Sequence, residues 1–289
     1  MKKVYIVAEV SQNHNGDINI AKELIEMAAM TRCDAVKFNK RHMPDELTKE
    51  AYDRPYDSEN AFAPTYGEHR EFLEFSQQQH IFLKNYANNR GLDYLLSVCD
   101  TQSLILAVEI FGLKFIKIPS KELTNLPLLE KLTTYPNIQV AFSIGMVNAL
   151  ELATALKILD RCLRPPIMVI CTSEYPCDLD NVNLNRIYSY KDYKKGFSSH
   201  VPDPTLGIAA VAMGAEYIEY HITLDREMKG SDQCVALEFE ELGFLVDSIR
   251  NLQIALGDMA TPTETPEYLI PARTKLLKEI CEDGIYRIH

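Results

Sequence analysis

The stretch GAEYIEYHITLDR, residues 214–226, contains a short apolar run that ends at His221 and passes into polar sequence. The stretch KKGFSSH, residues 194–200, closes on His200 in the same way. Two imidazoles at neighbouring strand ends are a suitable ligand pair for one divalent metal ion. A single histidine at such a position is more often an ordinary hydrogen-bonded side chain. Together, the two runs predict parallel strands whose carboxyl ends build one site.

Eight short β-type runs alternate with segments of helical period along the chain. The runs cover residues 4–9, 35–38, 94–97, 115–118, 139–143, 167–171, 196–198 and 217–221. An open doubly wound sheet usually carries a glycine-rich phosphate turn after its first strand, where this chain has EVSQNHNGD. Eight units in series favour an α/β fold, a closed (β/α)8 TIM barrel, with residues 1–289 as a single domain. We expect a long βα loop at about residues 40–67 and a short tail from about residue 261.

The composition indicates which kinds of partner are excluded and which cellular compartment is expected. A net charge of −11 and a pI near 5.2 argue against nucleic acid or an anionic membrane surface as the main partner. The seven cysteines form no CxxC pair, which is typical of reduced thiols in a cytoplasmic protein. No apolar run reaches the roughly 18 residues that a membrane span needs. The sequence therefore predicts a soluble cytoplasmic protein with a small-molecule ligand.

Charged and hydroxyl side chains close several of the earlier runs. In FIKIPSKELTNLPLL, Lys117 and Ser120 are a suitable clamp for an anion, and Glu122 is suited to act as a base. Glu9 ends the first run, and burying its carboxylate is costly unless a polar pocket receives it. The alternative interpretation of Lys37 is a surface residue that extends its ammonium to solvent. The alternative interpretation of Lys121 and Glu122 is an exposed ion pair. Hydroxyls after the fifth and sixth runs either complete a phosphate pocket or simply form turns.

Nine stretches of the chain carry a family resemblance. They read AEVSQNHNGD, DAVKF, FIKIPSKELTNLPLL, SIGM, CTSEYP, VNL, GFSSH, MGAEYIEYHITLDR and GSD. In this order they resemble the sialic acid synthases, which condense phosphoenolpyruvate (PEP) with an aldose to make nine-carbon 2-keto sugar acids. The resemblance implies a (β/α)8 barrel in which His200 and His221 bind a divalent cation. Mn²⁺ is the first choice, and Mg²⁺ and Co²⁺ also suit such ligands.

The resemblance also implies residue roles by position. The PEP-binding residues are Lys37, Ser97, Lys117, Ser120, Ser143, Ser173 and Ser198. The acceptor-sugar contacts are Asn39, Tyr175 and Asp232, and the catalytic carboxylates are Glu9 and Glu122. In the implied reaction, C3 of PEP adds to the aldehyde of an open-chain aldose, expected to be an N-acylated hexosamine. Water then adds at C2, and phosphate leaves by C–O cleavage.

Several departures from the family pattern bear on these expectations. Where family members read STPFD and GSGE, this chain reads SVCD and PSKE. It has Ser199 where members have an Asp before the first histidine, and Asn39 where they have a Gln. It also ends without the antifreeze-like domain of typical members, which takes part in their homodimer and supplies an acceptor-site arginine. We therefore expect residues 40–67, with Arg41, Tyr52, Tyr56 and Tyr66, to recognise the acyl group. A different acceptor, including a sugar without an N-acyl group, is equally compatible. The resemblance also implies a homodimer for this chain. The alternatives are a metal-dependent sugar isomerase or epimerase, and a non-catalytic sugar-binding barrel.

Overall fold

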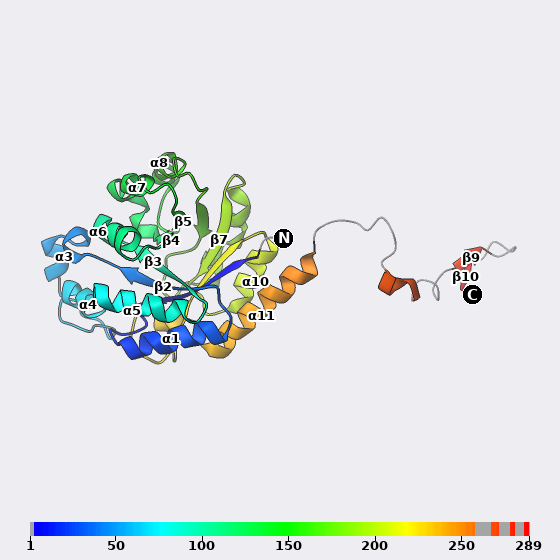
Figure 1. Ribbon diagram of the computed structural model, residues 1–289, viewed down its shortest axis with the longest axis horizontal. Helices are drawn as coiled ribbons and strands as arrows, with labels where there is room; N and C mark the ends of the chain where they lie inside the picture. Colours follow the sequence, from blue (N-terminus) through cyan, green and yellow to red (C-terminus); the bar gives the residue numbers. More distant parts are fainter. Residues whose placement is uncertain (1–2, 258–266, 272–277, 281–285, 289) are drawn as a thin grey trace. The chain divides into compact units, whose positions relative to one another are not determined.

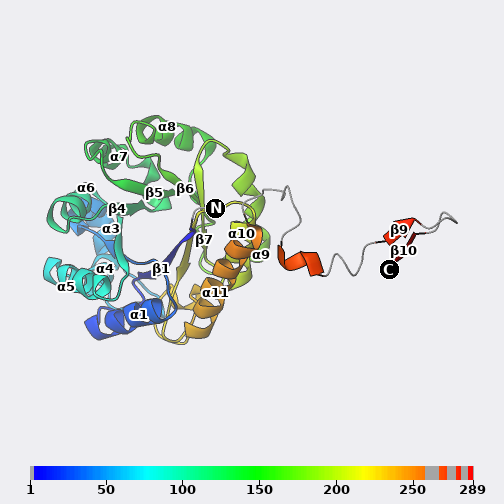
Figure 2. The same ribbon diagram turned by 45° about the vertical axis from the view of Figure 1, so that its right-hand side comes forward.

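A computed structural model of the chain describes residues 3–257, 267–271, 278–280 and 286–288. The chain divides into two compact units, residues 2–253 and residues 254–289 with Met1. In the first unit, eight parallel strands follow one another in sequence order and close into a barrel, with helices around it (Figures 1 and 2). The predicted (β/α)8 barrel is confirmed.

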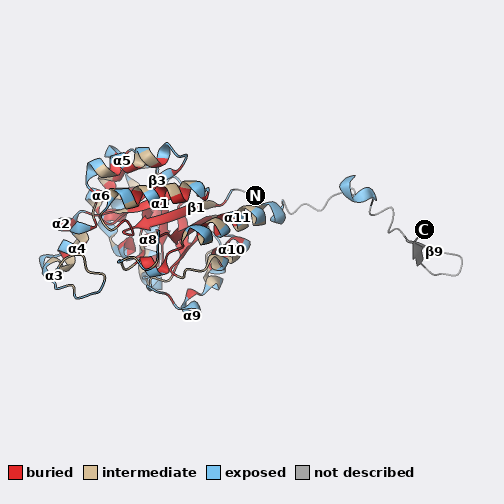
Figure 3. Ribbon diagram, turned by 90° about the horizontal axis from the view of Figure 1, so that it is seen from below, coloured by how far each residue is buried: buried red, intermediate tan, exposed pale blue. Residues whose placement is uncertain are grey.

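The barrel strands are short, and each begins and ends close to its predicted position. They are β1 (Tyr5–Ser11), β2 (Ala35–Lys40), β3 (Asp93–Val98), β4 (Phe115–Ile118), β5 (Gln139–Ser143), β6 (Ile167–Ile170), β7 (Lys194–Ser199) and β8 (Tyr217–His221). The main surrounding helices are α1 (Ile18–Met30), α5 (Gln77–Asn88), α6 (Thr101–Ile105), α7 (Leu126–Thr133), α8 (Ala149–Leu159), α10 (Pro204–Ala212) and α11 (Phe239–Leu256). Two of the helical segments between strands have a different pitch. They are the 3-10 helix η3 (Leu184–Ser189) and the π-helix η1 (Leu106–Ile110), which extends α6. The strands are buried and the outer helix faces are exposed (Figure 3).

Side chains that alternate along each strand fill the barrel interior in layers. An apolar layer near the amino ends includes Val7, Ala35, Leu95, Ala141, Ile167 and Tyr217. Because side chains on one face of a strand recur every second residue, the next inward positions are Glu9, Lys37, Ser97, Ser143 and Glu219. The strand register pairs Glu9 with Lys37 on one side and with His221 on the other. The charged and hydroxyl positions therefore lie one inward step closer to the carboxyl ends of their strands than the apolar positions do.

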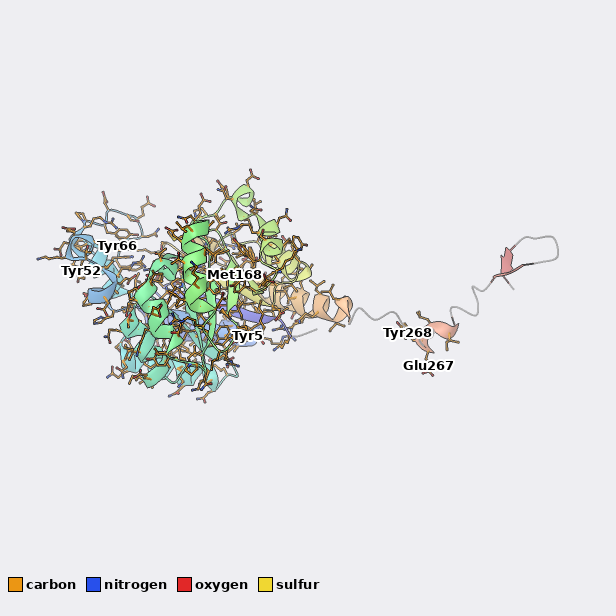
Figure 4. All side chains as sticks on the ribbon, turned by 90° about the horizontal axis from the view of Figure 1, so that it is seen from above. Tyr5, Tyr52, Tyr66, Met168, Glu267 and Tyr268 are labelled. Carbon is orange, nitrogen blue, oxygen red and sulfur yellow. The ribbon has the colours of Figure 1, made fainter. Side chains whose placement is uncertain are left out.

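The segment between β2 and α5 is more structured than the predicted loop. It contains α2 (Met43–Glu46), α3 (Lys49–Asp53) and α4 (Tyr66–Phe72), and we call residues 41–72 the excursion. Helices α4 and α5 are separate, because Ser76 begins a new helix with a capping box to Gln79. Tyr52 and Tyr66 lie together at one side of the barrel (Figure 4). Gly67 allows this packing, since a Cβ there would lie 2.1 Å from the Tyr52 ring.

The second unit contains the 3-10 helix η5 (Glu267–Leu269) and two antiparallel strands, β9 (Lys278–Ile280) and β10 (Tyr286–Ile288). The start of the predicted tail, near residue 261, lies outside the described residues. Within the described part of the chain, no helix combines the length and the apolar character needed to cross a bilayer.

Candidate active site

A cavity of about 400 Å³ opens at the carboxyl ends of the barrel strands. All but one of the site residues predicted from the sequence line it, namely Glu9, Lys37, Asn39, Ser97, Lys117, Ser120, Ser143, Ser173, Tyr175, Ser198, His200, His221 and Asp232. The exception is Glu122. The lining contains five lysines and arginines and three carboxylates, which gives it a formal charge of +2 within a chain of net charge −11. The cavity is therefore suited to an anionic ligand.

Four buried charges, Glu9, Lys37, Lys117 and Glu219, form what we call the charged floor of the cavity. Lys37 pairs closely with Glu9, and its Nζ lies 3.6 Å from a Glu219 oxygen. Lys117 Nζ lies 3.3 Å from the other Glu219 oxygen. Burial lowers the pKa of Lys37 to about 7, against the opposing effect of Glu219. Burial alone would raise the pKa of Glu219, but Lys117 and Lys37 hold it below its ordinary value. Two cations and two anions neutralise one another, which is what makes their burial tolerable.

Hydroxyl groups surround this floor and place donors above it. Lys37 Nζ donates to Ser97 Oγ at 2.7 Å, and Ser198 Oγ donates to Glu219 at 3.0 Å. On the opposite side, the backbone N–H of Gly145 donates to Ser120 Oγ at 3.0 Å. A Cβ at Gly145 would lie 2.5 Å from Ser173 Oγ, so only glycine leaves this wall intact. Cations next to hydroxyl donors are the usual environment of a bound carboxylate or phosphate.

The two predicted metal ligands face each other at the edge of the cavity. The ring centroids of His200 and His221 are 5.5 Å apart. Because His200 Nδ1 lies 2.6 Å from the carbonyl oxygen of Thr172, this nitrogen must donate, and Nε2 carries the lone pair. Burial, together with His221, lowers the pKa of His200 to about 4. Burial also lowers the pKa of His221, so both imidazoles are neutral at pH 7.

These histidines fit a metal ion that completes its coordination with other oxygens. His221 Nδ1 is buried and has no hydrogen-bond partner among the described residues, and it lies 3.8 Å from Asp232 Oδ2. Desolvation keeps the pKa of the Tyr175 phenol well above its ordinary value, so its hydroxyl donates to His200 Nε2 at 2.9 Å. Throughout the described part of the chain, no three histidine, cysteine or acidic side chains form a metal site by themselves. The backbone carbonyl of Thr172 orients His200.

The outer end of the cavity, toward the excursion, is a hydrogen-bonded chain. Asn39 Nδ2 donates to Ser11 Oγ at 2.7 Å, and Ser11 Oγ donates to Asp232 Oδ2 at 2.9 Å. Gln12 Nε2 donates to Asp232 Oδ1 at 3.2 Å. Arg70 NH1, from α4, donates to Gln12 Oε1 at 2.8 Å. We call these five residues the outer end, and their fixed donors and acceptors suit the hydroxyls of a sugar.

Glu122 lies next to the cavity but does not line it. It belongs to the 3-10 helix η2 (Ser120–Thr124), and its Oε2 accepts from Asn125 at 2.9 Å. Its Oε1 lies 3.4 Å from the ammonium of Lys121, which does line the cavity. The catalytic role implied for Glu122 by the resemblance stays a prediction.

Sequence reasoning missed three charged residues of the site, since Lys121, which was considered only in an exposed pair with Glu122, lines the cavity together with Glu219 and Arg70. Glu219 lies within the apolar run that ends at His221, and its position two residues earlier places it on the same inward face. That spacing was available in the sequence. Arg70 comes from the excursion and not from a strand end. Of the residues expected to contact the acceptor from this segment, Arg41 lines the cavity, whereas Tyr52, Tyr56 and Tyr66 do not.

The profile of the NeuB family matches residues 24–261. The chain belongs to the NeuB family. N-acetylneuraminate-9-phosphate synthase of Homo sapiens is 37% identical to this NeuB chain over 258 residues, which cover 88% of the chain and 71% of the relative. N,N'-diacetyllegionaminic acid synthase of Campylobacter jejuni is 39% identical over 265 residues, covering 89% and 79%.

A solved structure supports the same relationship. N-acetylneuraminic acid synthetase from Leptospira borgpetersenii, in complex with citrate, matches the NeuB chain with a TM-score of 0.77 and 28% identity, covering 95% of the chain and 93% of that protein. The NeuB chain is therefore a sialic acid synthase-like enzyme, as the sequence motifs predicted.

Proposed function

We propose that this chain condenses PEP with an open-chain aldose, with an N-acylated hexosamine as the first candidate, and releases inorganic phosphate. The observation that carries the proposal is that Lys37 and Lys117, with their surrounding serines, share one cavity with two neutral histidines. Ammonium groups and hydroxyl donors suit the carboxylate and phosphate of PEP. A sugar isomerase or epimerase would need no such anion-binding end. The relatives named as sialic and legionaminic acid synthases support the same class of reaction.

In the proposed reaction, C3 of PEP forms a bond to the aldehyde carbon, and the aldehyde oxygen takes up a proton. Water adds to the electron-poor C2, and the C2–O bond to phosphate then breaks, leaving a 2-keto-3-deoxy sugar acid. Lys37 and Lys117 stabilise the negative charge on the departing phosphate. A carboxylate must accept the proton of the attacking water. Glu9 and Glu122 are the candidates, Glu9 within the cavity lining and Glu122 behind Lys121.

We also propose that His200 and His221 hold a divalent cation, with Mn²⁺ as the first choice and Mg²⁺ or Co²⁺ as substitutes. When bound there, the ion would polarise the aldehyde oxygen of the acceptor. The unpartnered His221 Nδ1 and the unprotonated His200 Nε2 supply the nitrogen lone pairs that such binding needs. The Tyr175 hydroxyl donates to His200 Nε2, so this hydrogen bond would have to break for the ion to bind there.

The test is phosphate release from PEP with Mn²⁺, measured against N-acetylated hexosamines, diacetamido hexoses and plain aldoses. We expect release that depends on the aldose and disappears with EDTA. His221→Gln should lose both turnover and Mn²⁺ binding, the latter followed by electron paramagnetic resonance. His80→Gln is the matched control, because His80 is equally buried but does not line the cavity. Absence of release by folded, Mn²⁺-loaded protein with every aldose would refute the proposal and favour a non-catalytic barrel.

A further inference from the structure

Lys121 joins two segments that meet at the rim of the cavity. It belongs to η2, which follows β4, and its ammonium pairs closely with Glu46, the last residue of α2. The Glu46 side chain is only 6% exposed, whereas that of Lys121 is 42% exposed. Burial acts to lower the pKa of Lys121, but Cys99, Glu46 and Glu122 together raise it, so the ammonium is charged at pH 7. The pair is therefore a charged link between the excursion and the barrel.

The same ammonium also reaches one of the two candidate catalytic carboxylates. Lys121 Nζ lies 3.4 Å from Glu122 Oε1, and Glu122 Oε2 accepts from Asn125 at 2.9 Å. A lysine side chain is a flexible four-carbon stem, so its ammonium keeps a fixed position only where a partner holds it. Glu46 is a buried partner of this kind. Family members have a glycine where this chain has Lys121, and a glycine cannot make either contact.

Further charges continue this link through the excursion toward α5. Glu46 Oε2 lies 3.7 Å from Arg41 Nε, and Arg41 NH1 lies 3.5 Å from Glu74 Oε2. Glu74 Oε1 in turn accepts from Lys40 Nζ at 2.5 Å, so cations and carboxylates alternate along the row. Glu46 stands between the two cations Lys121 and Arg41. Removing its charge therefore separates the η2 end of the row from the rest.

Helix α2 depends on contacts at both of its ends. It has four residues, too few for a helix to be stable by itself. At its start, the backbone N–H of His42 donates to Asp100 Oδ2 at 2.7 Å, and Asp100 also caps α6. At its end, Glu46 contacts Lys121 and Arg41. The pair with Lys121 is therefore the contact that ties the end of α2 to η2.

We infer that Lys121 is a positioning residue that couples Glu122 to the excursion. With Glu46 holding the ammonium, the Glu122 carboxylate has a fixed cation on one side and Asn125 on the other. When the Glu46 contact is broken, the ammonium is free to turn away and Glu122 loses one of its two supports. The inference rests on the proposed function, because it takes Glu122 to accept the proton of the attacking water.

The decisive variant is Glu46→Gln in the whole chain, assayed by phosphate release from PEP with Mn²⁺ and the aldose that gives the highest rate. Because Glu46 lies outside the cavity lining, this variant keeps every lining side chain. We expect kcat to fall by about 10- to 100-fold, since small displacements of a catalytic group cause losses of that size. The KM for PEP should change by less than about threefold. Lys121→Arg, which keeps the charge, should retain most of the wild-type kcat.

A double-mutant cycle separates one shared link from two independent effects. Lys121→Met should lower kcat about as much as Glu46→Gln does, and the double variant should be no slower than either single variant, because each change alone breaks the link. A double variant whose loss is the product of the two single losses would overturn the inference. A kcat of Glu46→Gln within about twofold of the wild type would also overturn it, and would leave the condensation standing.

The matched control is the ion pair between Glu130 and Arg161. These side chains lie 2.6 Å apart and join α7 to the segment after α8, outside the cavity lining. Their pair is as charged as that of Lys121 and Glu46, but it does not reach Glu122. Glu130→Gln should therefore leave kcat unchanged.

Hydrogen exchange provides a readout that does not need turnover. In Glu46→Gln, amide exchange should speed up by about tenfold both in α2 and in η2, since a hydrogen bond between charged groups contributes about this much to local stability. Glu130→Gln should leave both segments unchanged. If no aldose is turned over, this measurement decides. Faster exchange in both segments supports the coupling, whereas any other pattern overturns it.

Discussion

Glu219 balances the charge of the charged floor, and replacing it with glutamine should lower the free energy of unfolding of the barrel. The carboxylate accepts from Tyr217, from Ser198 at 3.0 Å and from Lys117 at 3.3 Å, and it also lies 3.6 Å from Lys37. In Glu219→Gln the floor changes from two cations and two anions to two cations and one anion. The new amide group can also accept fewer of these bonds than the carboxylate did.

The expected loss of stability follows from this imbalance. Removing one partner of a buried ion pair typically costs about 3–5 kcal/mol, because the other charge stays buried. For a domain of this size, such a loss lowers the unfolding midpoint by roughly 10 °C. The measurement is thermal and urea unfolding of Glu219→Gln beside Glu216→Gln. Glu216 lies just before β8, and within the described residues its carboxylate makes no ion pair.

A second readout separates charge balance from simple packing. Inorganic phosphate bound above the floor would replace the lost negative charge, so it should raise the midpoint of Glu219→Gln more than that of the wild type. A Glu219→Gln protein within about 1 kcal/mol of the wild type would refute the reasoning, since a buried unbalanced lysine costs several times more. Equal stabilisation of both proteins by phosphate would refute the charge argument alone.

Two further predictions concern the cavity wall and acid stability. Gly145→Ala places a Cβ 2.5 Å from Ser173 Oγ, so we expect the KM for PEP to rise by about tenfold with little change in unfolding midpoint, which steady-state kinetics would check. Burial lowers the pKa of His14 and of His80 to about 3, so between about pH 3 and 6.5 the unfolded chain binds protons that the folded chain does not. Stability should therefore fall as the pH drops through this window, by about 1.4 kcal/mol per pH unit for each histidine, and more gently in His80→Gln.

Much of the fold was predictable because the strands are short, apolar and separated by helical segments. The site was predictable for the same reason, since polar residues that end successive runs must meet at one rim of a barrel. Glu219 was overlooked because it stands inside an apolar run, although the period of two from His221 identifies its face. A stricter use of strand alternation would have found it.

The excursion was less predictable, for physical reasons. Its helices α2 and α3 have four and five residues, too few to show a helical period. The place of Arg70 depends on Gln12, 58 residues earlier in the chain, and on the ring of Tyr66. Long-range contacts of this kind leave no local pattern. The sequence therefore indicated that this segment lies over the rim, but not that α4 contributes an arginine.

The pairing of Lys117 with Glu219 also constrains how the protein is made. The two residues are 102 positions apart, and the ribosome delivers the lysine long before its carboxylate. Until β8 emerges, a nascent chain has unpaired strand edges on β1 and β7 and lacks the anion that balances Lys117. The last strand, β8, therefore closes the barrel and at the same time supplies the carboxylate that neutralises Lys117. We expect the barrel to form as a single late event in synthesis, with no stable half-barrel on the way.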